Sequence, residues 1–170
     1  VSPALETKYG YDSDGRVASV TPPGQEPWTF TYQPLAGEPA STGRLRTVER
    51  SNLQSGQTVN TYVYGVPVSG SGAPYDLAPS QVARWAQTEA PTDATAVFPP
   101  DQIPSGNPPS SYEYATVYYL DANGRQTNVA QPGGGISSTS YDAHGNVTMG
   151  LSAQNRQRAL DWGQSTNAEA

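Results

Sequence analysis

Short runs of alternating apolar and polar residues, each ending at turn residues, dominate the chain. Three passages share one pattern, in which a β-favouring run reaches an Asp, two residues intervene, a Gly follows and a second run begins. They are YGYDSDGRVASVTP at 9–22, VYYLDANGRQTNVAQP at 117–132 and TSYDAHGNVTMG at 139–150. An Asp side chain accepts a hydrogen bond from the backbone two residues later, and Gly takes the positive φ of a type I turn with a bulge. The pattern predicts three β-hairpins. Their predicted turn residues are Asp12, Gly15, Asp121, Gly124, Asp142 and Gly145.

In the segments between these passages, alternating apolar and polar residues predict further strands. Trp28, Phe30 and Tyr32 fall on one face of a strand, a reversal follows at 37–43, and 44–50 alternates again. These two strands are a degenerate copy of the hairpin pattern. The second strand still begins with Gly-Arg-Leu at Gly43, but the turn before it has no Asp and is longer. Residues 58–68 predict a further strand.

An insertion interrupts the hairpins at 65–111, which holds nine of the chain's 16 prolines. Proline blocks both helices and central strands, so we expect a mostly extended segment over the surface of the sheet. Ser80 is predicted to cap one short helix that runs to Gln87. The expected inward side chains are Val82, Trp85 and Ala86 of that helix, and Val97, Phe98 and Ile103 after it.

A helix-like stretch ends the pattern at 152–162, with Ser152 as its predicted N-cap. The last two turns are 21 residues apart, from Gly124 to Gly145, as expected for hairpins stacked on their neighbours. The predicted fold class is all-β, a set of stacked antiparallel hairpins. We expect one segment over 1–170, with repeats at about 8–64 and 112–151.

Composition and charge narrow the range of functions. The chain has 11 Tyr against 2 Phe, which favours half-buried sheet surfaces where a ring packs and its hydroxyl stays hydrated. A net charge of −6 disfavours nucleic-acid binding, and the absence of Cys excludes disulfides and thiol chemistry. No membrane or export segment is recognisable, and we expect the chain to be a piece of a longer polypeptide.

The strings YGYDSDGRV, YYLDANGRQ and SYDAHGNVT resemble the YD repeats of Rhs (rearrangement hotspot) proteins and teneurins. Leu120 departs from the motif at its Tyr position. The resemblance implies a sheet of hairpins that winds, in full-length relatives, into a hollow shell around a C-terminal toxin or effector. The residues that match the motif, including the degenerate copy, are Tyr11, Asp12, Gly15, Arg16, Gly43, Asp121, Gly124, Arg125, Tyr141, Asp142 and Gly145.

An enzymatic function finds little support in the residues. His144, the single histidine, occupies a turn position where an exposed residue is expected, and no G-x-S-x-G elbow occurs. Shell proteins of this family can carry a D-P-x-G-W-like self-cleavage signature, but the string at 161–163 lacks the Pro and the spacing. We expect no catalysis and no cofactor.

Calcium binding is one alternative, because Asp12 and Asp14 precede Gly15 as in acidic D-x-D-G loops. An EF-hand with Gly15 at its sixth position would begin at Gly10 and end at Thr21, so two carboxylate ligands are missing. A structural turn is favoured, with no metal site.

Carbohydrate binding is the other alternative, because exposed aromatic rings stack on sugars. Cross-strand pairing of alternating Tyr residues competes with it as an explanation. The candidate rings are Trp28, Tyr32, Tyr62, Tyr64, Trp85 and Tyr114.

The resemblance therefore favours a non-enzymatic scaffold segment of a secreted or cell-surface protein. Its expected partners are the neighbouring repeats of its own parent chain and the enclosed polypeptide, with carbohydrate as the alternative ligand. We also expect self-association, because hairpin edges without neighbours invite pairing.

Overall fold

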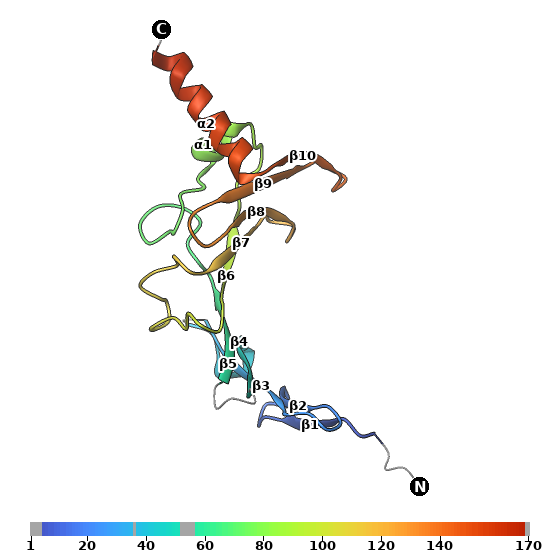
Figure 1. Ribbon diagram of the computed structural model, residues 1–170. Coiled ribbons are helices and arrows are strands. Elements are labelled where there is room, and N and C mark those ends of the chain that lie inside the picture. The colour runs from blue at the N-terminus through green and yellow to red at the C-terminus, as the bar shows by residue number, and fades with distance from the viewer. Residues whose placement is uncertain (1–4, 36, 52–56, 169–170) are drawn as a thin grey trace. The chain divides into compact units, whose positions relative to one another are not determined.

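A computed structural model describes residues 5–35, 37–51 and 57–168 (Figure 1). The chain divides into two compact units, one of residues 1–63 with 97–107 and the other of residues 64–96 with 108–170. Each unit consists mainly of antiparallel strands, so the all-β prediction is confirmed at the level of fold class.

The first unit contains five strands that follow one another in space as they do in sequence. Every pair of neighbours among them is antiparallel. The strands are β1 (Lys8–Tyr11), β2 (Val17–Thr21), β3 (Trp28–Gln33), β4 (Arg44–Ser51) and β5 (Gln57–Tyr64), and a 3₁₀ turn η1 (Ala40–Thr42) precedes β4.

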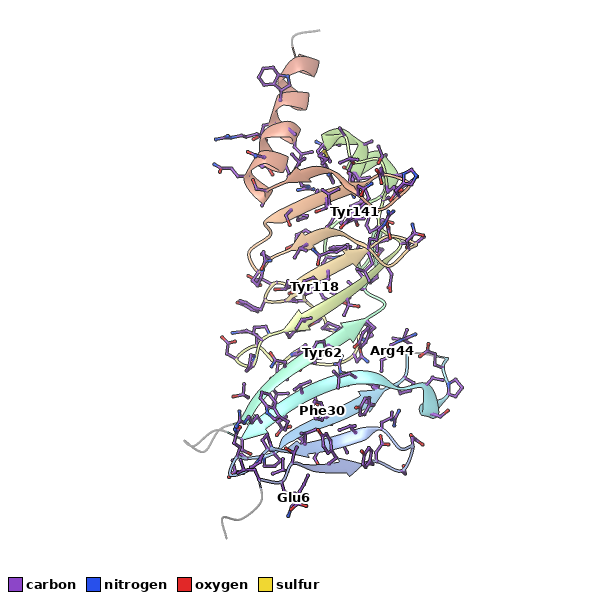
Figure 2. The ribbon with its side chains drawn as sticks, turned by 90° about the vertical axis from the view of Figure 1, so that its right-hand side faces the viewer. Glu6, Phe30, Arg44, Tyr62, Tyr118 and Tyr141 are labelled. Atoms are coloured by element: carbon purple, nitrogen blue, oxygen red, sulfur yellow. The ribbon has the colours of Figure 1, made fainter. Side chains whose placement is uncertain are left out.

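Side chains of the first unit are mostly half-buried rather than buried. Along β3, Trp28, Phe30 and Tyr32 are half-buried while the residues between them are exposed, which confirms the predicted alternation. Figure 2 labels Phe30 on this strand. Among the described residues of this unit, only Thr61, Val63 and Phe98 are buried. The first unit is therefore a sheet with a thin core.

The second unit also consists of antiparallel strands in sequence order. They are β6 (Asp93–Phe98), whose last two residues belong to the first unit, β7 (Thr116–Leu120), β8 (Gln126–Ala130), β9 (Ile136–Tyr141) and β10 (Val147–Leu151). Its helical elements are α1 (Pro79–Val82), η2 (Ala83–Trp85) and α2 (Ala153–Ala168). The insertion supplies α1 and η2, and α2 contacts η2, β9 and β10.

The core of the second unit lies between its strands and the insertion. Its buried apolar residues come from both parts of the chain, and the larger ones are Val66, Leu77, Val82, Trp85, Val117, Tyr119, Val129 and Ile136. The short helix thus holds the insertion to the sheet, as its apolar spacing predicts.

Several expectations for the insertion are wrong in detail. The helix begins at Pro79 after Ala78, so Ser80 lies inside it and does not cap it. Ala86 adopts a left-handed conformation with φ 61°, which ends η2 and leaves its side chain exposed. Ile103 is 61% exposed, so it does not anchor the insertion as expected. Phe98 is buried, as expected, but it lies on strand β6, which was not predicted because prolines flank it.

The C-terminal helix confirms one prediction and extends another. Ser152 Oγ accepts a hydrogen bond from the Asn155 backbone N–H at 3.2 Å, the geometry of an N-cap. The helix then continues to Ala168, beyond the predicted end at 162.

Candidate functional site

The three Asp-x-x-Gly turns have the predicted geometry. In each, the Gly N–H donates to the Asp carbonyl at 2.9–3.1 Å, and the Asp N–H donates to the carbonyl four residues later at 2.9 Å. A register shift accompanies each hairpin, as a bulge requires. The glycines have φ values of 79° at Gly15, 76° at Gly124 and 86° at Gly145, which favour a residue without Cβ.

The Asp side chain organises each turn from within. Asp121 Oδ1 accepts from the backbone N–H groups of Asn123 at 2.8 Å and Arg125 at 2.9 Å. Asp12 and Asp142 make the equivalent pairs of bonds in their own turns. The predicted bond to the second residue after Asp is confirmed, and a second bond four residues on was not anticipated.

The arginine after the glycine contacts both its own turn and the second strand that follows this turn. Arg16 Nε donates to Asp12 Oδ2 at 2.8 Å, and its guanidinium lies 4.8 Å from the ring centroid of Tyr32. Tyr32 Oη in turn donates to the Val17 carbonyl at 2.8 Å. We call this set of an Asp, the Arg four residues later and the Tyr sixteen residues after that Arg the clasp.

A second clasp has the same spacing and contacts. Arg125 Nε donates to Asp121 Oδ2 at 2.7 Å, the guanidinium lies 4.8 Å from the Tyr141 ring, and Tyr141 Oη donates to the Gln126 carbonyl at 2.9 Å. Arg125 Nη1 also reaches the Asp142 carbonyl at 3.2 Å, so one hairpin holds the turn of the next. Figure 2 places Tyr141 on β9.

Electrostatics favour the ionised form of each clasp. Burial opposes ionisation of Asp12 and Asp121, but hydrogen bonds from Arg16 and Arg125 outweigh it and lower the pKa of both carboxyls. The Asp12 hydrogen bond likewise raises the pKa of Arg16, and Asp121 raises that of Arg125. The two clasps differ in burial, because the Asp121 side chain is only 4% exposed and the Asp12 side chain 25%.

The third turn keeps the Asp but replaces the Arg. Asn146 Nδ2 donates to Asp142 Oδ2 at 2.9 Å, and this bond is the first cause of the lowered pKa of Asp142. An amide carries no charge to place over a ring, so the turn is closed without a clasp.

The degenerate copy at 37–43 uses a different carboxylate. Glu38 Oε2 accepts from the Leu35 N–H at 3.1 Å, and Glu38 Oε1 pairs with Arg44 at 2.9 Å. Figure 2 shows Arg44 beside this longer tip. Gly43 lies beyond the tip, and its carbonyl lies 3.5 Å from Arg16 Nη1. The Asp-x-x-Gly pattern does not identify Glu38, because this reversal is longer and its carboxylate comes from a Glu.

The motif residues at the Tyr position do not behave alike. Tyr141 is held in a clasp, Leu120 is half-buried on β7, and Tyr11 is 63% exposed on β1. Tyr11 has a strand on one side alone among the described pairings, because β1 is the first strand of the order.

A buried amide pair, which sequence reasoning missed, fastens the insertion to the sheet. Gln87 Nε2 donates to Asn128 Oδ1 and Asn128 Nδ2 donates to Gln87 Oε1, both at 2.9 Å. Trp85 Nε1 donates to Gln87 at 2.9 Å, and Asn128 donates to Ser138 at 2.8 Å. The partners lie 41 residues apart, so no local signal identifies them.

The alternative sites gain little support. His144 is exposed in its turn, and its backbone N–H donates to Asp142. Within 5–35, 37–51 and 57–168, no group of three His, Cys, Asp or Glu side chains could hold a metal ion. Asp12 and Asp14 both pair with Arg16, so the same cation occupies both carboxylates of the acidic loop.

The candidate sugar-binding rings are mostly engaged within the protein. Trp85 is 3% exposed, which contradicts a stacking role on the surface. Arg16 covers Tyr32, and Arg50 lies 5.0 Å from the Trp28 ring. Tyr114 remains 51% exposed.

The chain matches no protein-family model, no curated protein and no solved structure. In the part of the chain that the structure describes, no helix is long and apolar enough to cross a membrane.

Proposed function

We propose that the chain is a scaffold segment of an Rhs/YD-repeat protein, part of the wall of a β-shell that encloses a C-terminal toxin or effector. The observation that carries the proposal is the clasp, which recurs with one set of contacts at Asp12, Arg16 and Tyr32 and again at Asp121, Arg125 and Tyr141.

The polar side chains of the clasp all contact other parts of the chain, either within their own turn or on the neighbouring strand. The carboxylate accepts from two backbone N–H groups and an Arg, the Arg faces a ring, and the Tyr hydroxyl donates to a backbone carbonyl. These contacts give each group a structural role and support a scaffold rather than a substrate site. A wall that must stay closed requires this kind of repeated contact between neighbours.

The first test is the coding sequence on both sides of this segment. The proposal expects further Asp-x-x-Gly hairpins at about 20-residue spacing, a distinct C-terminal domain and a secreted or cell-surface location. Flanking sequence without such hairpins would contradict it.

The second test is limited proteolysis of the full-length protein, followed by detection of the C-terminal polypeptide. Arg125→Gln breaks the ion pair and the ring contact, so we expect the enclosed polypeptide to be cleaved faster than in the wild type. His144→Ala alters an exposed turn residue outside the clasps and is the matched control. Equal cleavage rates in wild type, variant and control would contradict a shell held by clasps.

A further inference from the structure

Three loops of the second unit converge on an open cavity that the scaffold role does not use. They are residues 72–75 of the insertion, residues 109–113 before β7, and Gly133 and Gly134 in the β8–β9 turn. The cavity has a volume of about 630 Å³, which lies in the ordinary range for small-ligand sites, ~300–1,000 Å³.

Two tyrosine rings and several hydroxyl groups form its walls. Tyr75 and Tyr112 are half-buried, and Ser110, Ser111 and Glu113 are exposed along the lining. The lining contains no Lys, Arg or His. With Glu113 as its charged residue, on a chain of net charge −6, the cavity disfavours phosphate, sulfate and other anions.

The β8–β9 turn approaches the first of these rings closely. Gly134 has φ +93°, and a Cβ at this position would lie 3.7 Å from Tyr75 Oη. Any residue with a side chain would be strained in this backbone conformation, so this part of the cavity wall is formed by a glycine without a side chain.

We propose that this cavity binds a neutral saccharide. The C–H face of a sugar packs on Tyr75 and Tyr112, while its hydroxyls bond to Ser110, Ser111 and Glu113. Proline-rich peptides prefer grooves lined mainly by aromatic rings, whereas here small and hydroxylated residues outnumber the two rings.

The test is an NMR and calorimetric titration of the whole chain. The probes are methyl β-D-glucopyranoside, methyl α-D-mannopyranoside, N-acetylglucosamine and cellotriose. We expect saturable binding of at least one, with shifts at the amides of Tyr112, Gly133 and Gly134. Tyr112→Ala should lower the affinity at least roughly tenfold, as loss of a stacking ring does. Tyr118→Ala removes an exposed ring of β7 outside the cavity and should change nothing.

Tyr112→Phe separates loss of the ring from loss of the hydroxyl. It keeps the stacking ring, so the affinity should stay within roughly threefold of the wild type, whereas Tyr112→Ala loses it. Three results would overturn the proposal: no binding of any probe, an equal loss from Tyr118→Ala and Tyr112→Ala, or shifts of the same amides by a decaproline peptide alone. Each is distinguishable from failure of the scaffold role, which depends on flanking hairpins and proteolysis.

Discussion

At the residue scale, the Asp-x-x-Gly-Arg string combines a backbone requirement with an electrostatic one. Glycine supplies the left-handed φ, and the Asp supplies an acceptor for two N–H groups and a cation. Asn146 shows that the two requirements separate, because this turn keeps its Asp and Gly and lacks the cation.

The glycine requirement predicts a large effect at one position and a small effect at another. Gly124→Val should lower the free energy of unfolding by more than about 1 kcal/mol, because a β-branched residue is strained at φ 76°. Gly150→Val on β10 is the matched control, since Gly150 does not have positive φ and a Cβ there meets nothing within 4 Å. Urea denaturation of both variants measures the difference, and equal stabilities would refute the turn assignment.

The electrostatic requirement predicts loss of stability in acid. The pKa values of Asp12, Asp121 and Asp142 are lowered on folding, so their contribution is present above the unfolded value of about 3.9 and is lost as pH falls through the folded values. The melting temperature should therefore drop steeply below about pH 4. Asp121→Asn should lower it at pH 7 and flatten the acid limb, measured by circular dichroism from pH 2 to 7. An acid limb as steep as in the wild type would count against the Asp121 contribution.

At the element scale, each hairpin depends on its neighbour, and the insertion depends on a few long-range contacts. Gln87 and Asn128 satisfy each other in a buried site, where an amide without a partner is costly. Glu89, two residues after Gln87, also pairs with Arg125 at 3.1 Å. The insertion is therefore tied both to the core and to a clasp.

Removing one side of the amide pair should loosen the insertion. Asn128→Ala leaves the Gln87 side chain without two of its bonds, so the free energy of unfolding should fall by about 1–3 kcal/mol. Proteolytic cleavage within 65–111 should become faster. Asn123→Ala, on an exposed turn, should stay within about 0.5 kcal/mol of the wild type. Matching stabilities of the two variants would contradict the role of the pair.

The hairpins were predictable because their chemistry is local. Asp12 and Gly15 are three residues apart, and the turn follows from their side chain and backbone preferences. The clasp needs a Tyr sixteen residues away, and the amide pair needs a partner 41 residues away, so neither has a signal in a short window. Strand β6 was hidden for another reason, since Pro91, Pro99 and Pro100 flank it without entering it.

At the scale of the whole molecule, the buried side chains are unevenly distributed. The second unit contains most of the buried apolar side chains, and the first unit has half-buried rings held by cation–π contacts and hydroxyl bonds. In the first unit, the terminal strand β1 has the most exposed side chains. Tyr9 is 58% exposed and Tyr11 63%, both on this strand.

The exposure of β1 predicts self-association. The described strand pairings of β1 involve β2 alone, so its other edge presents backbone groups to a second molecule beside two exposed rings. Sedimentation velocity should show average mass rising with concentration. The double variant Tyr9→Lys and Tyr11→Lys should remain monomeric, because lysines on an edge strand oppose pairing. Tyr118→Lys places a lysine on β7, which lies between β6 and β8, and should associate like the wild type. A wild type that stays monomeric at millimolar concentration, or a Tyr118→Lys variant that loses association as fully as the double variant, would refute pairing through β1.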